Sequence, residues 1–287
     1  MASPTLQNRK LPSMRFKRLQ LGSHAILWIW AAIVLIPLYI LVSGSLKDRL
    51  SIYTNTFGLP ETWNFSNYTD ILKSSDFLRY FLNSFIVVTI SLILVLIIGV
   101  MVSYSLAQWQ SKFSSFLYIF FIAGMMIPIK IASIQLMQIM KTLGLINTIW
   151  ALIPIYVAMG IPIAVFILTE FIRQIPHDLI DAALMDGSGR FRILASLIVP
   201  LTRPAMATVG IYNLIPFWND LWFPLIMISD EKSKTLLLGV TRLFGQYQTD
   251  WSKVLAVLTL SSLPVLILYL FMSQQFIKSM TSGAIKE

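Results

Sequence analysis

The segment DLIDAALMDGSGRFRILASLIVP, residues 178–200, lies between two long apolar stretches and carries three aspartates and two glycines. Pro176, just before it, suits the first turn of a helix, and Asp178 is favoured near the positive end of the helix dipole. Ile180 and Leu184 recur at helical spacing and so share one apolar face. The pattern predicts a short helix at the start of this segment.

Two glycines end that helical pattern. Gly187 and Gly189 flank a serine, and glycine adopts backbone angles that other residues resist. A second short segment begins at Arg190 and leads toward the next apolar stretch. Residues 176–200 are therefore predicted to form a helix, a glycine bend and a second short helix.

The rest of the chain has the composition of a membrane protein. Of its 287 residues, 56% are hydrophobic and 12% are charged, and the mean hydropathy is +0.75. Soluble domains usually carry about 25% charged residues, whereas a membrane span needs about 20 apolar residues. We predict an all-α polytopic membrane protein whose transmembrane domain covers residues 25–277. Its six expected transmembrane helices are residues 25–43, 81–106, 113–134, 145–169, 204–229 and 254–274.

Basic residues at the start of the chain set the expected orientation. Residues 1–24 contain no acid, and their basic residues are Arg9, Lys10, Arg15, Lys17 and Arg18. Because cytoplasmic flanks carry an excess of lysine and arginine, this tail is predicted to be cytoplasmic. Six spans then place the tail of residues 278–287 on the same side. The first apolar stretch has no small-residue cleavage site, so we expect a retained helix.

The residue types exclude several kinds of chemistry. The chain has no cysteine and only His24 and His177 as imidazoles, so we expect neither a disulfide nor a metal site. It has no G-x-x-x-x-G-K-[S/T] loop, so ATP hydrolysis is not expected here. A membrane-embedded enzyme would need clustered acids, histidines or nucleophiles at membrane depth, and these are almost absent. Basic residues that flank spans explain the net charge of +9 without nucleic acid.

Two interpretations of the loop of residues 176–200 follow from its residues alone. It could be an interfacial helix on lipid headgroups, or it could be a docking element for another protein. The apolar face is short, and anionic headgroups would repel Asp178, Asp181 and Asp186. The small side chains of Ala182 and Ala183 would permit close approach of another surface.

The same residues resemble the cytoplasmic signature of ABC importer permeases. That signature is Glu-Ala-Ala, three residues, glycine, about nine residues, and an apolar residue before Leu-Pro. The matching residues here are Ala182, Ala183, Gly187, Ile198, Val199 and Pro200. Asp181 stands in place of the glutamate and Val199 in place of the leucine, and both replacements are conservative.

Further blocks resemble the carbohydrate branch of this family, in particular the maltose-type permease that is the second permease of a heterodimer. They are LPETWNFSNYTDIL (59–72), Asn83-Ser84, GLINT (144–148), FWNDLWFPLIMISD (217–230) and QQFIKSMTSGAIKE (274–287). Each block is short, but their order and spacing together cover nearly the whole chain.

The resemblance implies the ABC type I importer permease fold in a bacterial cytoplasmic (inner) membrane, with this chain forming half of a translocation pathway. It implies four partners, namely a second and different permease, an ATPase dimer that holds ATP and magnesium, an extracytoplasmic solute-binding protein, and a sugar or oligosaccharide as cargo. No cofactor is expected on this chain. Residues 178–192 would be the coupling loop that docks on the ATPase. The docking residues implied are Asp181, Ala182, Ala183, Asp186, Gly187 and Arg190.

The outer part of the fifth span offers a candidate substrate pathway. Trp218, Asn219 and Asp220 interrupt its apolar pattern, and polar groups at that depth usually face a protein interior or an aqueous cavity. An aromatic ring beside an amide is a usual arrangement for binding a sugar. The alternative, an interfacial aromatic anchor beside a structural polar residue, is the more frequent one, and Asp220 suits a structural role equally well.

Two rival functions remain at this stage. An importer permease of the same class could carry a non-sugar solute such as an amino acid or an osmolyte. An ion- or proton-coupled transporter working alone would need intramembrane ionisable residues. Asp220 is the main candidate for such a residue, so this rival is weakly supported.

Overall fold

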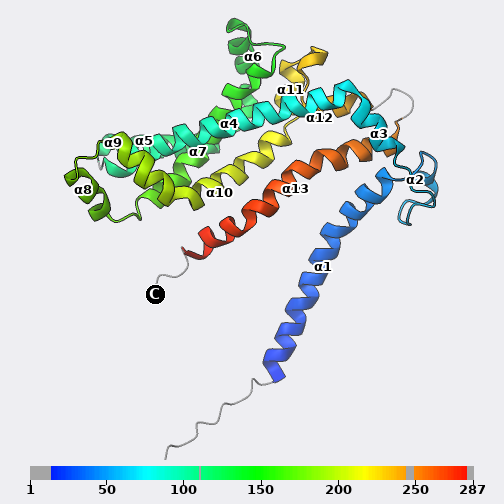
Figure 1. Cartoon of the computed structure of the whole chain (residues 1–287), viewed down its shortest axis with the longest axis horizontal. Coiled ribbons are helices and arrows are strands. Elements are labelled where there is room, and N and C mark those ends of the chain that lie inside the picture. Colours follow the sequence, from blue (N-terminus) through cyan, green and yellow to red (C-terminus); the bar gives the residue numbers. More distant parts are fainter. Residues whose placement is uncertain (1–13, 110, 244–248, 283–287) are drawn as a thin grey trace, which may run out of the picture.

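The computed structural model describes residues 14–109, 111–243 and 249–282, and every regular element in these ranges is a helix (Figure 1). Five helices are long and apolar enough to cross a membrane, and a sixth crossing results if one bent pair of helices counts as a single span. The long helices are α1 (Met14–Ser45), α4 (Ser75–Gln108), α5 (Lys112–Met126), α7 (Leu152–Ile172), α10 (Val199–Trp218) and α13 (Trp251–Ser282).

Shorter helices connect these spans. On the side of α2 and α3 they are α2 (Ser51–Thr54), α3 (Ser66–Lys73), η4 (Glu231–Ser233), α12 (Leu236–Val240) and η5 (Thr241–Leu243). Next to the break in the third span they are η1 (Ile129–Ala132), α6 (Ser133–Thr142), η2 (Ile149–Ala151) and α11 (Trp222–Met227). At the opposite end they are α8 (His177–Met185), α9 (Arg190–Ile193) and the π-helical turn η3 (Leu194–Ile198). Figure 1 shows α8 and α9 at one end of the bundle and α2, α3 and α12 at the other.

The core of the bundle is α7, which packs against α4, α5 and α10. Small residues let these helices approach closely, as is usual between helices in a membrane. A Cβ atom added to Gly160 on α7 would lie 2.7 Å from Cγ2 of Val95 on α4 and 2.9 Å from Oδ1 of Asn213 on α10. One added to Gly99 on α4 would lie 2.9 Å from the Cβ of Ala164. The three helices therefore interlock through positions that admit no larger side chain.

The first helix, α1, stands apart from this core and runs away from the bundle in Figure 1. No residue of its most apolar window is buried, whereas Ser43 to Lys47, at its C-terminal end and just after it, are buried. There α1 packs on α13, with Gly44 against the side chain of Leu255. The helix is thus joined to the described bundle at one end.

The loop after α1 is held by buried polar groups. The Nζ of Lys47 donates to the carbonyl oxygens of Asn55, at 2.5 Å, and Thr56, at 3.1 Å, and burial lowers the pKa of the ammonium group. Asn67 is buried as well, and its amide donates to the carbonyl oxygens of Ser45 and Lys47. Unpaired buried polar groups are costly, so these bonds fix the loop against the end of α1.

The third span differs from the prediction. Residues 113–134 were expected to form one helix, but α5 ends at Met126, and the helical segment Ile129–Thr142 turns away from it by 82°. Pro128 explains the break, because it has no amide hydrogen and favours an extended residue before it. Ile127 has such a conformation, with φ −85° and ψ 116°. α6 consequently projects from the bundle (Figure 1).

The fifth span is also placed differently. Residues 204–229 were expected to form it, but the helical run extends from Arg190 through η3 and α10 to Trp218, and α11 is a separate short helix. The second short helix of the predicted loop is therefore the N-terminal end of the fifth span. Its π-helical turn precedes Pro200 and Pro204, whose missing amide hydrogens disturb regular α-helical bonding.

Candidate functional site

The candidate coupling loop consists of α8, the glycine bend and α9. α8 follows Pro176 and has Asp178 in its first turn. Ile180 is its anchor, since this side chain is only 3% exposed and belongs to the main apolar core. Ala183 is half-buried and packs against the same core, whereas Asp181 and Ala182 are exposed.

The bend after α8 is a Schellman motif. The amide of Gly187 donates to the carbonyl of Leu184, and the amide of Ser188 donates to the carbonyl of Ala183, both at 3.0 Å. This motif places its glycine in the left-handed region, and Gly187 has φ +75°. Gly189 has an ordinary extended conformation, with φ −71° and ψ 158°. Of the two predicted bend residues, only Gly187 requires a glycine.

The exposed face of the loop combines carboxylates with apolar side chains. Asp181 and Asp186 are exposed, and Met185 between them is 88% exposed. Phe191 on α9 is 77% exposed. A rigid surface with protruding apolar groups and negative charge suits docking against a protein that offers an apolar cleft and basic residues.

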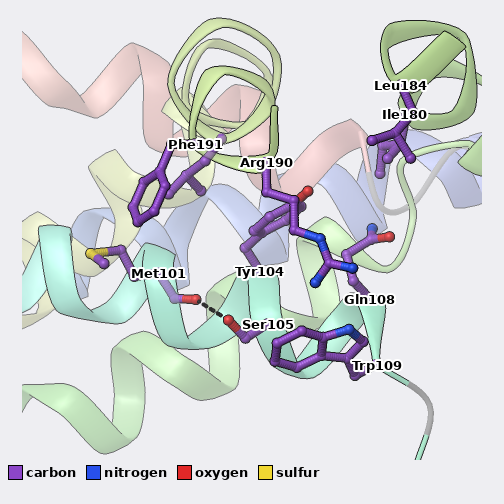
Figure 2. A pocket seen from close by; sticks show the side chains of 10 residues that line it. Met101, Tyr104, Ser105, Gln108, Trp109, Ile180, Leu184, Arg190 and Phe191 are labelled. Carbon is purple, nitrogen blue, oxygen red and sulfur yellow. Dashed lines mark hydrogen bonds between the residues drawn. The ribbon is translucent and has the colours of Figure 1, made fainter. Parts of the chain in front are cut away.

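Arg190, a predicted docking residue, lies differently from the carboxylates. Its guanidinium carbon is 5.2 Å from the ring centre of Trp109, the residue that follows α4, which is a cation–π arrangement (Figure 2). Beside this contact is a cavity of about 350 Å³ between the end of α4 and the loop. Tyr104, Gln108 and Leu184 help to line it. The structure thus brings Arg190 against α4 rather than beside Asp181 and Asp186.

The predicted substrate-pathway residues have mainly structural surroundings in this chain. Trp218 is 6% exposed, and its indole Nε1 donates to the carbonyl of Ser261 at 2.9 Å. Asp220 accepts a hydrogen bond from the hydroxyl of Tyr156 at 2.9 Å. It also accepts backbone hydrogen bonds at the start of α11. Of Trp218, Asn219 and Asp220, only Asn219 is exposed.

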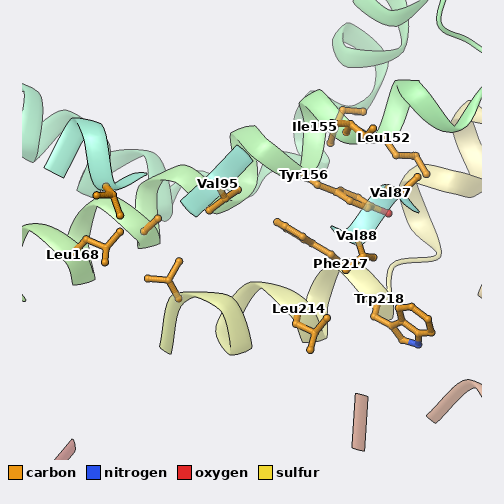
Figure 3. Packing of buried hydrophobic residues seen from close by; sticks show 14 of the residues in the cluster. Val87, Val88, Val95, Leu152, Ile155, Tyr156, Leu168, Leu214, Phe217 and Trp218 are labelled. Carbon is orange, nitrogen blue, oxygen red and sulfur yellow. The ribbon is translucent and has the colours of Figure 1, made fainter. Parts of the chain in front are cut away.

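Tyr156 is central to this region, although the sequence reasoning did not single it out. Its ring stacks on Phe217 with centres 4.9 Å apart, and Figure 3 shows the two rings facing each other beside Trp218. A tyrosine within an apolar span carries no sequence signal that distinguishes it from an interfacial aromatic residue. Its partner, Asp220, is distant in the sequence.

Four residues on α10 and just after it form an exposed stripe that the sequence reasoning also missed. They are Tyr212, Ile215, Pro216 and Asn219, and all are exposed. Their spacing of three, four and seven residues puts them on one helical face. That spacing was available in the sequence, but an apolar stretch gives no indication of which face the bundle covers.

The opposite end of the bundle carries an ionic cluster. The Tyr80 hydroxyl donates to Oε2 of Glu231 at 3.0 Å and accepts from Arg242 at 3.1 Å. Arg242 also pairs with Glu231 at 2.9 Å and lies 3.6 Å from Asp76. The hydrogen bond from Lys234 is the main cause that lowers the pKa of Glu231. The cluster ties the start of α4 to η4 and η5.

This arrangement is that of a polytopic helical membrane protein with an exposed helix–glycine–helix loop at one end. Within the described ranges, no group of three or more histidine, cysteine, aspartate or glutamate residues could hold a metal ion.

Comparison with known proteins gives the family. Residues 96–282 match the model of the binding-protein-dependent transport system inner membrane component, and the chain belongs to that family. It is thus a permease subunit of an ABC importer, a non-catalytic, multi-pass component of the inner membrane.

Related proteins cover nearly the whole chain. The diacetylchitobiose uptake system permease of Streptomyces coelicolor is 33% identical over 92% of this chain and 88% of its own length. The melibiose/raffinose/stachyose import permease of Bacillus subtilis is 31% identical over 92% of this chain and 97% of its own length. A bacterial ABC transporter that imports the acidic polysaccharide alginate has a chain of the same fold, with a TM-score of 0.80 and 20% identity over 93% of this chain and 99% of that one.

These findings confirm the predicted fold class and the resemblance to carbohydrate-type importer permeases. They do not test the roles of Asp181, Ala182, Ala183, Asp186, Gly187 and Arg190, or those of Trp218, Asn219 and Asp220. Those roles stay predictions.

Proposed function

We propose that this chain is one of two permease subunits through which an oligosaccharide crosses the bacterial cytoplasmic membrane, driven by a separate ATPase pair. The ATPase pair holds ATP and magnesium, the second permease is a different chain, and an extracytoplasmic binding protein delivers the cargo. The observation that carries the proposal is the coupling loop, because it is anchored by Ile180, fixed by a Schellman turn and exposed on its other face.

Coupling through this loop requires it to move as a unit. ATP binding would close the ATPase pair, and the docked loop would carry that motion into the spans because α9 continues through η3 into α10. Asp181 and Asp186 would pair with basic residues of the ATPase, at about 0–1 kcal/mol each while exposed. Ala182 and Ala183 would allow close approach, and Met185 would enter an apolar cleft. Loop contacts must differ between the two states for any coupling to occur.

The cargo is inferred from the named activities of the relatives. Their printed names concern diacetylchitobiose in one case and melibiose, raffinose and stachyose in another. An importer for a non-sugar solute, such as an amino acid or an osmolyte, is the alternative that a cargo test must address.

The exposed stripe on α10 is the part of this chain best suited to line the pathway. Tyr212 offers a ring face and Asn219 an amide, seven residues apart on one side of the helix. Trp218 and Asp220 would support this stripe from behind, because their polar atoms already have partners. Replacing Tyr212 with alanine should then lower uptake while leaving ATPase docking intact.

The proposed orientation places the N-terminus, the coupling loop and the C-terminus in the cytoplasm. Because the chain has no cysteine, single introduced thiols can report on it. A membrane-impermeant maleimide applied to whole spheroplasts should label Glu61→Cys and should leave Met185→Cys unlabelled until the membrane is opened. The reverse pattern would overturn the orientation.

The decisive experiment isolates the complete assembly and measures transport. A tagged chain purified in mild detergent should bring with it an ATPase subunit and a second permease. Reconstituted with its binding protein, the assembly should take up labelled oligosaccharide only when ATP and magnesium are present in the compartment that faces the ATPase. ATP-driven uptake of an amino acid or osmolyte instead would support the alternative cargo, and recovery of the chain without an ATPase would refute the proposal.

A further inference from the structure

Among the described spans, α4 is built as the stiffest. It runs for 34 residues from Ser75 to Gln108 without a proline, a length of about 50 Å at 1.5 Å per residue. The other full-length spans, α1, α7, α10 and α13, each contain at least one proline within the helix. Proline removes a backbone hydrogen bond and bends a helix, so α4 is the element best able to transmit displacement along its axis.

The inner end of α4 is in contact with the coupling loop. Trp109 caps the helix, and its ring lies under the guanidinium group of Arg190 at 5.2 Å (Figure 2). Ile180 and Leu184 of α8 line the same cavity as Trp109. A displacement of the loop can therefore reach α4 through the contact between Arg190 and Trp109, without passing along the chain through α10.

The outer end of α4 is in contact with the segment of residues 231–243. The Tyr80 hydroxyl bonds to both Glu231 and Arg242, and Asp76 lies near Arg242. The Tyr80 ring packs directly on Gly239 of α12, where no side chain would fit. This segment is on the face that the proposed function assigns to the binding protein.

Between its ends, α4 packs on α7 through Gly99 and Ala164, and through Val95 and Gly160. Because the two backbones approach this closely, α7 restricts any shift of α4 to a direction along their interface. Packed interfaces of this kind have discrete arrangements and do not deform continuously.

We propose that α4 acts as a rod that couples the ATPase side of the importer to its binding-protein side, with Trp109 and Tyr80 as the positioning residues at its two ends. The proposal rests on the proposed function, because that function places the ATPase at the coupling loop and the binding protein at the other end. Arg190 is then a residue that holds the loop to α4, in addition to any contact with the ATPase.

The test uses the complete importer in lipid nanodiscs and measures how strongly the loaded binding protein stimulates ATP hydrolysis. Trp109→Ala removes the inner contact, and Tyr80→Phe removes the outer hydroxyl while keeping the ring. Each should lower the stimulation about fivefold, as expected for the loss of one such contact. The double variant should lose less than the product of the two single losses, because both contacts serve the same helix and weakening one end limits what the other end can transmit. Independent effects at sites this far apart would multiply to about 25-fold.

Matched variants separate coupling from packing. Trp109→Phe keeps a ring under Arg190 and should restore most of the stimulation. Trp30→Ala removes a tryptophan of similar exposure, 63% against 55% for Trp109, on the part of α1 that lies apart from the described bundle, and should leave the stimulation unchanged. Arg190→Gln removes the other partner of the contact and should reproduce the loss, which covers the case in which Trp109→Ala does not assemble.

Three results would count against the rod. Multiplicative losses in the double variant would overturn it, as would an equal loss in Trp30→Ala or full stimulation in both Trp109→Ala and Arg190→Gln. A wild-type assembly that contains an ATPase but shows no stimulation by any binding protein would instead overturn the proposed function itself.

Discussion

Replacing Gly187 with alanine tests whether the bend of the coupling loop matters for its conformation alone. Gly187 has φ +75°, and a Cβ atom built on it meets no heavy atom within 4 Å. The substitution therefore adds backbone strain without a steric clash. A left-handed conformation costs an L-residue about 1–2 kcal/mol, and the stiffer unfolded chain returns about 0.4–1 kcal/mol. The net loss is about 1 kcal/mol, or about fivefold in the equilibrium constant between the native bend and its alternatives.

The consequence should appear in docking. If the ATPase binds only the native bend, its apparent Kd rises by the factor by which that bend is depopulated. We therefore expect the Kd between the detergent-solubilised permease and its fluorescently labelled ATPase subunit to rise by up to about fivefold in Gly187→Ala. The melting temperature of the transmembrane bundle should hardly change, because the bend lies outside the apolar core.

Gly189→Ala is the matched control. This glycine also has no heavy atom within 4 Å of a built Cβ, but its φ is −71°, which any residue adopts. Its Kd should equal that of the wild type. Equal losses in the two variants would refute the argument from backbone strain, and so would an unchanged Kd in Gly187→Ala.

Three further perturbations follow from the structure. Gly160→Ala places a methyl group 2.7 Å from a valine methyl group, so overpacking should lower stability by about 1–3 kcal/mol. The loss should appear as a lower melting temperature in detergent. Gly124→Ala is the control and should be neutral, because the nearest atom to its added methyl group is 3.8 Å away. Tyr156→Phe removes the hydrogen bond to Asp220 and should cost about 1 kcal/mol in the same assay; no loss would mean that water replaces the hydroxyl. The pKa of Glu231 is lowered in the folded state, chiefly by the hydrogen bond from the lysine three residues later, so its contribution to stability is present above its unfolded pKa and is lost as the pH falls through the folded value. The difference in melting temperature between wild type and Glu231→Gln should accordingly shrink on acidification, and a difference that grows would contradict this sign.

The sequence predicted those features of the fold that depend on local pattern. Apolar length identified the spans, and the spacing of Ile180 and Leu184 with the glycine after them identified α8 and its bend. Local pattern misled where a helix ends inside an apolar stretch. Apart from Lys130, the residues around Pro128 are as apolar as the rest of the third span, so apolar length alone did not divide α5 from α6. A single proline is tolerated in many membrane helices, and α7 continues past Pro162.

The candidate site was predictable in position but not in the direction of its side chains. Asp181 and Asp186 were expected to be exposed, and they are. Arg190 was grouped with them because it is close in sequence, but it lies on the other side of the bend, against Trp109. Trp109 is about 80 residues earlier in the chain, and no spacing rule connects it with Arg190. Contacts between distant segments decide which charged residues face a partner and which face the chain itself.

The blocks that resemble the carbohydrate branch contain residues that join the helices through hydrogen bonds. The Asn83 amide donates to the carbonyl oxygens of Lys232 and Lys234, and Asn147, with φ +63°, accepts from the amide of Ser229. The Trp222 indole donates to a serine hydroxyl beside the break in the third span. These residues join α4, α7 and the region around α11 at the end of the bundle opposite α8, so they would be needed whatever solute is carried. Resemblance in these blocks therefore identifies the fold, whereas differences in cargo should concentrate on the exposed stripe of α10, where a side chain can change without breaking a bond within the bundle.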